Sequence, residues 1–189
     1  MKKKTKVIAI FSAIVVLLLS ATIVCFLQNK DYKDVELSLN SFQSDIEYQY
    51  DDVKWLSSVQ EVNKHLPYSL NKDPQREIVD ESINYYTSKN KYILDGQSAS
   101  ASFQFVKDQL QIIQFSFILD ENSDQWFEDQ VTNLQQLYGK ETDTLNSSSE
   151  QLQLKSVGYR WDTDNTSLQI ILLTGDNKTP SVTLSIGVK

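Results

Sequence analysis

The chain is poor in the residue types that build the most recognisable catalytic and metal sites. Its 189 residues include one cysteine, one histidine and five glycines. A cysteine zinc site, a redox motif or a histidine metal site needs more of these residues than the chain has. Five glycines also leave little room for a glycine-rich loop that cradles phosphate. These shortages argue against the enzyme classes that short motifs reveal.

Charge is missing from residues 7–27, and lysines at positions 2, 3, 4 and 6 stand directly before this run. A helix rises about 1.5 Å per residue, so the run is about long enough to cross a ~30 Å hydrocarbon core. The lysines are expected to stay in the cytoplasm. We therefore expect a cytoplasmic flank over 1–6, a single-pass transmembrane signal-anchor from Val7 to Leu27, and an extracytoplasmic remainder in the bacterial cell envelope.

Two other interpretations of the N-terminus stay open. A cleaved signal peptide has a shorter apolar region and a small-x-small cleavage site, but Leu19 stands three positions before a cut after Ala21. A lipoprotein signal would end at Cys25, and the bulky Val24 precedes that cysteine. An uncleaved anchor explains the run best, because it continues through Phe26 and Leu27.

The part after the apolar run is strongly acidic. Removing the four N-terminal lysines from 18 Lys and Arg leaves 14 basic residues against 25 acidic ones, a balance of −11. This charge argues against binding to nucleic acid or to anionic lipid. The same part has no cysteine, so it folds without disulfides, and it is long enough to bury a core of its own.

The pattern beyond the run alternates between helix and strand signals. We expect residues 28–50 to form a juxtamembrane spacer and the start of the domain, and residues 51–189 to form an extracytoplasmic α+β domain. Ser58 and Glu61 have capping-box spacing before a short helix that Pro67 ends. Residues 68–80 are expected to be a loop, followed by a strand over 83–87.

A hairpin and a second helix give the clearest local patterns. Residues 100–105 and 112–117 alternate between polar and apolar side chains, which predicts an antiparallel hairpin that turns at Lys107 and Asp108. A helix then follows, with an apolar stripe and a terminal Gly139. The stripe contains Phe127, Val131, Leu134 and Tyr138, widened by Trp126 and Leu137. A one-sided stripe implies that this helix lies across a sheet.

The remaining chain predicts a polar loop over 141–154 and three strands, roughly 157–162, 167–173 and 181–188. The fold class that results is α+β. It has an antiparallel sheet with helices packed on one face, in an order that suggests a tandem αβββ repeat.

The layout also carries a family likeness. It rests on the string from Phe103 to Leu110, the aromatic strand to Phe117, the helix end at 137–140, the Trp161 strand, and the helix opening from Trp55 to Val62. In these features the chain resembles small exported bacterial domains with the helix-on-sheet layout of β-lactamase-inhibitor-like proteins and outer-membrane-assembly lipoproteins. The resemblance implies a binding or scaffolding module without a catalytic site.

No residue is assigned as catalytic, cofactor-binding or metal-binding. His65 falls at the end of the first helix, where an imidazole can favour free carbonyls, and no nucleophile elbow accompanies it. The three tryptophans, Trp55, Trp126 and Trp161, are expected to pack in the core. The predicted function is a non-catalytic, membrane-tethered binding domain that recognises a protein or another envelope component, with the ligand left open and an envelope protein as a candidate partner.

The alternative function is an exported carboxylate-dependent hydrolase that acts on envelope glycans or peptides. Its candidate acids are Asp51, Asp52, Asp162 and Asp164. A cleft that holds two of these acids within about 5–10 Å of each other would favour this enzyme.

Overall fold

The computed structural model describes residues 34–44, 46–73, 82–119, 122–176 and 178–189. Asp34–Lys189 forms one compact unit, and Met1–Lys33 is a separate unit. The expected anchor from Val7 to Leu27 lies outside the described residues. Among those residues, no helix has the length and apolar character needed to cross a membrane.

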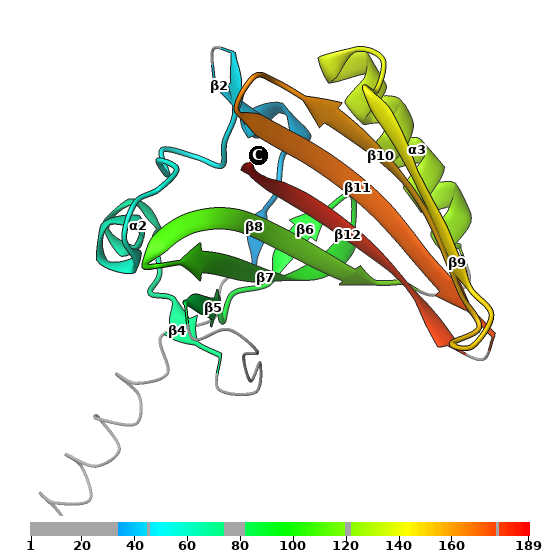
Figure 1. Cartoon of the computed structure of the whole chain (residues 1–189), viewed down its shortest axis with the longest axis horizontal. Helices are drawn as coiled ribbons and strands as arrows, with labels where there is room; N and C mark the ends of the chain where they lie inside the picture. Colours follow the sequence, from blue (N-terminus) through cyan, green and yellow to red (C-terminus); the bar gives the residue numbers. More distant parts are fainter. Residues whose placement is uncertain (1–33, 45, 74–81, 120–121, 177) are drawn as a thin grey trace, which may run out of the picture. The chain divides into compact units, whose positions relative to one another are not determined.

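A ten-stranded sheet organises the compact unit (Figure 1). Its main path runs β1-β6-β7-β8-β12-β11-β10-β9, and β5 pairs with β7 beside β6 and also with β4. All the pairings are antiparallel except the pairing of β1 with β6. The strands are β1 (Val35–Glu36), β4 (Asn71–Lys72), β5 (Ile83–Thr87), β6 (Tyr92–Leu94), β7 (Gln97–Val106), β8 (Gln109–Ile118), β9 (Asp143–Ser149), β10 (Leu154–Asp162), β11 (Thr166–Gly175) and β12 (Lys178–Val188).

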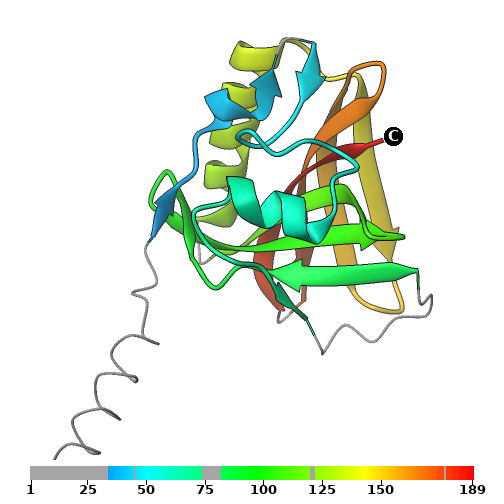
Figure 2. The same ribbon diagram turned by 90° about the vertical axis from the view of Figure 1, so that its left-hand side faces the viewer.

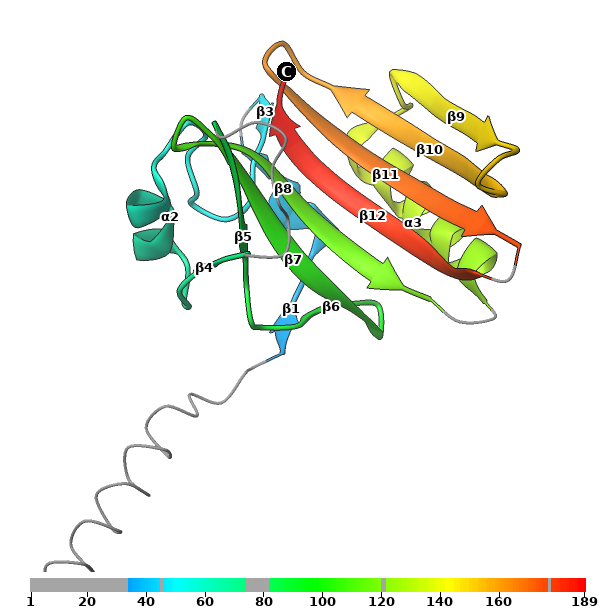
Figure 3. The same cartoon turned by 60° about the horizontal axis from the view of Figure 1, so that its bottom comes forward.

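Two α-helices and an N-terminal segment cover one face of this sheet. The helices are α2 (Val59–His65) and α3 (Ser123–Tyr138), and the segment contains the short 3₁₀ helix η1 (Leu39–Phe42) and a ribbon of β2 (Gln43–Ser44) with β3 (Glu47–Tyr48). Figure 3 shows α3 behind β12, β11 and β10, and Figure 2 shows the N-terminal segment, in blue and cyan, running beside α3. The α+β class with helices on a large sheet is therefore confirmed.

Alternation divides each central strand between the two faces, interrupted in the β7–β8 pair by one register shift. The covered, inner face carries residues that are each at most 7 % exposed: Phe103 and Phe105 of β7, Phe115 and Phe117 of β8, Val182, Leu184 and Ile186 of β12, and Leu168, Ile170 and Leu172 of β11. Phe127, Val131 and Leu134 of α3 pack into this core. Burying apolar area at about 25 cal/mol per Å² is the main stabilising contribution here.

The other face of the sheet is open and carries no charge on its four central strands. Cross-strand rows run across β7, β8, β12 and β11, for example Ser102, Gln114, Ser185 and Gln169. Hydroxyl and amide side chains dominate these rows, and aliphatic residues such as Ile171 interrupt them. Ile171 lies over Gly158 of β10, where an added Cβ would stand 2.8 Å from the Ile170 carbonyl oxygen.

A polar cluster fastens the N-terminal ribbon to the turn between β10 and β11. One oxygen of Glu47 accepts hydrogen bonds from the hydroxyls of Thr163 and Thr166 at 2.7 and 2.8 Å, and the other accepts from the Asn165 amide at 2.8 Å. These donors hold the pKa of Glu47 below its usual value. The Tyr48 amide donates to the Thr166 hydroxyl at 2.8 Å, so β3 is held at two successive residues.

Several local predictions are confirmed. Both hydrogen bonds of the capping box between Ser58 and Glu61 are present at the start of α2. The β7–β8 hairpin turns at Lys107 and Asp108, which both have positive φ. Gly139 ends α3 with a φ of +81°. The strands expected over 83–87, 157–162, 167–173 and 181–188 are all present, most of them longer than predicted.

Other predictions are wrong. Residues 141–154 are not a loop, because Asp143–Ser149 forms β9 and β10 begins at Leu154. β9 lies at the sheet edge and five of its seven residues are exposed, so it lacks the apolar alternation that marks a half-buried strand. The expected loop over 68–80 contains β4, and the short β6 went unpredicted. Leu137 does not join the buried stripe of α3, since it is 43 % exposed. The described residues form five strands after α2 and four after α3, in place of the three expected after each helix.

Candidate binding groove along helix α3

Helix α3 is held firmly at its C-terminal end. The Gly139 amide donates to the Gln135 carbonyl at 2.9 Å, and the Trp161 indole of β10 donates to the Gly139 carbonyl at 2.8 Å. On the other side, the Tyr138 hydroxyl donates to the Leu39 carbonyl of η1. Burial raises the pKa of Tyr138 to about 12, so this phenol stays protonated as a donor at neutral pH.

The helix has one apolar face and one polar face without any positive charge. Its sixteen residues contain no lysine, arginine or histidine. Asp124, Glu128 and Asp129 supply carboxylates, and the remaining polar face is rich in glutamine and asparagine. The polar face therefore offers amide groups, which both donate and accept hydrogen bonds, beside carboxylates, which only accept them.

A groove of about 500 Å³ runs between α3 and the N-terminal segment. From α3 it is lined by Gln130, Asn133, Gln136 and Leu137, and from the opposite wall by residues 36–40 and by Leu94 and Asp95. Four leucines line the groove, of which Leu137 is exposed while the other three are at most 7 % exposed, and its charged lining residues are Glu36 and Asp95. The described lining carries a net negative charge, since it includes two carboxylates and no basic residue from the part of the chain that the structure describes.

A buried amide in α3 fixes one wall of the groove. Gln130 is 1 % exposed, and its amide nitrogen donates to an Asp95 carboxylate oxygen at 3.3 Å. Asp95 and Gly96 both have positive φ in the two-residue turn between β6 and β7. Asp-Gly is a favoured sequence for such a hairpin turn. The turn therefore places a carboxylate against the helix at a defined position.

A second hollow of about 370 Å³ continues along the N-terminal half of α3. Its lining includes Gln97 from β7, and Gln125, Trp126 and Asp129 from the helix. Trp126 is 9 % exposed, and among the described residues its buried indole nitrogen has no hydrogen-bond partner. The turn from Asp95 to Gln97 contributes to both hollows, so the two form successive parts of one surface beside α3.

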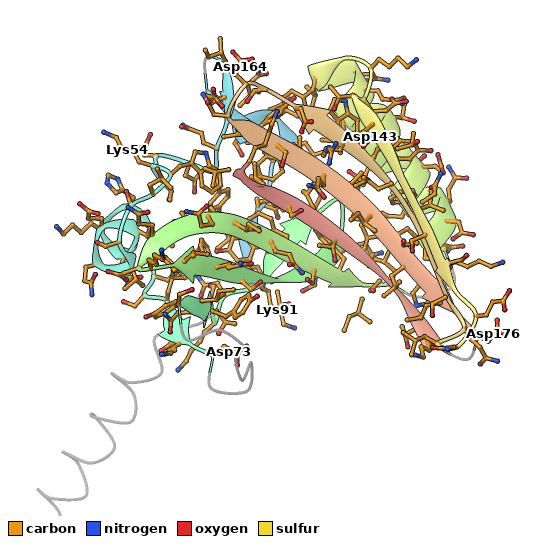
Figure 4. All side chains as sticks on the ribbon, viewed as in Figure 1. Lys54, Asp73, Lys91, Asp143, Asp164 and Asp176 are labelled. Atoms are coloured by element: carbon orange, nitrogen blue, oxygen red, sulfur yellow. The ribbon has the colours of Figure 1, made fainter. Side chains whose placement is uncertain are left out.

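The acids proposed for a hydrolase line neither hollow. Asp51 and Asp52 occupy the turn between Tyr50 and Val53. Asp162, at the end of β10, forms ion pairs with Arg160 at 3.4 Å and Lys189 at 4.0 Å. Asp164 is exposed in the turn that follows β10, at the upper end of the sheet in Figure 4.

His65 is exposed in the last turn of α2, as the sequence indicated. Trp161 and Trp126 are buried, and the half-buried Trp55 packs against the core while its indole donates to the Tyr48 carbonyl at 2.7 Å. The expectation that the tryptophans pack in the core is therefore confirmed. In the described part of the chain, no three His, Cys, Asp or Glu residues come together as ligands for one metal ion.

The groove residues were not singled out from the sequence. The amide-rich face of α3 and its lack of basic residues were visible, as was the Asp95-Gly96 turn signal, but nothing in the sequence placed residues 36–40 opposite the helix. Comparisons with protein-family models, curated proteins and solved structures found no match.

Proposed function

We propose that this chain is a membrane-tethered, extracytoplasmic, non-catalytic domain that binds an envelope protein in the groove along α3. In this proposal Val7 to Leu27 forms the tether and the compact unit from Asp34 onward forms the binding module. The observation that supports this proposal most directly is the groove itself. Its described lining combines leucines, amide side chains and two carboxylates, with no lysine, arginine or histidine beside them.

The lining favours a partner segment that is positively charged and partly apolar. Glu36 and Asp95 attract lysine or arginine, the amides of Asn133 and Gln136 suit backbone groups, and the exposed Leu137 offers apolar contact at the rim. The net negative charge of the exported part also attracts a positively charged partner at long range. An extended basic segment of another envelope protein is therefore the ligand class that fits this groove.

Site-specific photo-crosslinking in intact cells tests this function. A photoreactive residue at Asn133, which is exposed in the groove, is expected to give a defined adduct with one envelope protein. The same residue at Ser100, which is exposed on the open sheet face, is the matched control and is expected to give none. Equal labelling from both positions, or no adduct from Asn133, would contradict the proposal.

A charge reversal sharpens the result. Glu36→Lys changes an exposed lining residue, so folding is expected to be unaffected while the Asn133 adduct is lost. Raising the salt concentration should weaken the adduct of the unaltered protein, because salt screens exposed charges over a Debye length of about 8–10 Å. An adduct that survives Glu36→Lys unchanged would exclude a charge-based ligand.

A further inference from the structure

Strand β9 forms one outer edge of the sheet. It spans Asp143–Ser149 and pairs with β10 on one side, and no described strand pairs with its other side. Figure 3 shows β9, in yellow, as the last strand of the sheet. In an antiparallel pair, alternate residues turn their backbone groups away from the neighbouring strand. β9 therefore presents N–H and C=O groups along an open edge, except that the Thr144 N–H already donates to the Asp143 carboxylate at 2.9 Å.

This edge lacks the features that normally prevent strand pairing. Proteins guard such edges with lysine, proline, bulges or very short strands. β9 has no lysine, arginine or proline, it is seven residues long, and its register with β10 runs from Leu154 opposite Ser149 to Arg160 opposite Asp143 without a shift. Its single charged residue, Asp143, forms an ion pair with Arg160 through one carboxylate oxygen at 2.9 Å, and its other oxygen accepts from the Thr144 N–H at 2.9 Å. Pairing of a second strand at Thr144 therefore requires this carboxylate oxygen to release the Thr144 N–H.

The opposite side of the sheet is guarded. There β7 is covered by β5 and β6, and the strands outside these, β4 and β1, are only two residues long. β4 also contains Lys72. The two outer sides of the sheet therefore differ: the β4 and β1 side has very short strands and a lysine, and the β9 side has neither.

We propose that β9 pairs antiparallel with β9 of a second copy of this chain, about a two-fold axis at Asn146. This register sets Asn146 opposite the second copy's Asn146, Thr144 opposite its Ser148, and Asp143 opposite its Ser149. No like charges face each other, and the Asp143 carboxylate meets a hydroxyl that can donate to it. The two Leu145 side chains become diagonal neighbours on the open face.

The chemistry of β9 favours its own copy over an unrelated strand. A two-fold pairing is self-complementary, since each contact occurs twice, and it closes after two subunits. The sequence meets both conditions, because its polar residues pair with one another and its single acid lies away from the axis. The pairing would join the two sheets into one continuous sheet.

Disulfide trapping of the full chain in membranes tests this pairing. The natural Cys25 is first replaced by serine in every variant. Paired residues on neighbouring strands have Cβ atoms about 4.5–5.5 Å apart, a separation that needs little adjustment to reach the Cβ distance of a disulfide. Asn146→Cys should therefore become mainly a disulfide-linked dimer on mild oxidation. Ser100→Cys, exposed on β7, controls for random collision and should stay monomeric.

The register is tested separately. Thr144→Cys alone and Ser148→Cys alone should not cross-link, because each is four residues from its own counterpart, about 13 Å along a strand. The two variants expressed together should form a mixed dimer. Cross-linking of Asn146→Cys at the level of Ser100→Cys would overturn the pairing, and efficient cross-linking of Thr144→Cys alone would overturn the register.

A charge experiment gives a second readout on the full chain in detergent. Asn146→Lys places two ammonium groups opposite each other and should convert the dimer into monomer by light scattering. Mixing Asn146→Lys with Asn146→Asp should restore the dimer, since the opposed charges then attract. A variant mixture that stays monomeric, or an Asn146→Lys protein that stays dimeric, would contradict the proposal.

Discussion

The two faces of the sheet use the same strands in different ways. On the inner face, Phe103, Phe115 and Leu184 are fully buried under α3 and the N-terminal segment. On the open face, their sequence neighbours Ser102, Gln114 and Ser185 form a row of short uncharged side chains. Alternation along a strand thus separates a surface that stabilises the fold from a surface whose chemistry is free for other uses.

The largest predicted effect is on the inner face, where Leu134 of α3 is fully buried. Leu134→Ala removes most of this side chain and leaves a cavity, which typically costs about 2–5 kcal/mol of the ~5–15 kcal/mol that stabilise a domain. Thermal unfolding of the full chain in detergent should show a clearly lower melting temperature, by about 2–4 °C for each kcal/mol.

His65→Ala is the control for that experiment, because His65 is exposed at the end of α2. Such surface changes usually stay within about 0.5 kcal/mol. A Leu134→Ala protein that melts like the unaltered chain would contradict the helix-on-sheet core. Loss of a biological activity in a folded His65→Ala protein would contradict the non-catalytic proposal.

The next effect is on the open face and tests whether that face is structurally neutral. Gly158→Ala places a Cβ 2.8 Å from both the Ile170 carbonyl oxygen and the Ile171 side chain. Overpacking of this kind costs about 1–3 kcal/mol. Ser100→Ala on the same face changes an exposed side chain and should cost almost nothing. Urea unfolding of both variants should separate them, and equal midpoints would show that the strands shift easily to admit the methyl group.

The smallest effect concerns the polar cluster that fastens the ribbon over the inner face. The folded pKa of Glu47 is lowered by hydrogen bonds from Thr163, Thr166 and Asn165. Its ionised form therefore stabilises the fold above the usual glutamate pKa of 4.5, and this contribution is lost as the pH falls through the lower folded pKa. In Glu47→Gln the free energy of unfolding, measured by urea at several pH values, should fall less steeply as the pH is lowered. An unchanged slope would show that Glu47 contributes nothing to acid sensitivity.

Local signals in the sequence predicted much of this fold. The capping box at Ser58, the β7–β8 hairpin and the apolar stripe of α3 each depend on residues close together in the chain, and all three are present. β9 was missed, since an edge strand of serine, threonine and asparagine shows no burial pattern. Its existence depends on pairing with β10, which local propensity does not report.

The candidate groove was less predictable for a related reason. Its walls come from residues 36–40, from the Asp95 turn and from α3, which are far apart in the chain. The buried Gln130 lies on the apolar stripe of α3, four residues after Trp126 and four before Leu134, but nothing in the sequence pairs it with Asp95. The carboxylates proposed for hydrolysis were prominent in the sequence, yet they lie in turns or, for Asp162, in ion pairs.

The central position of β12 has a consequence for how this domain is made. β12 lies between β8 and β11, although it is the last of the described strands to be synthesised. The β7–β8 hairpin and the β9–β11 meander can each form from local contacts, but each keeps an unpaired edge until β12 arrives. Contacts such as Phe117 with Val182 then join the two halves in one late step. Until that step β8 and β11 each have an open edge in addition to that of β9, so this is the stage at which a chaperone would protect the newly made chain from aggregation.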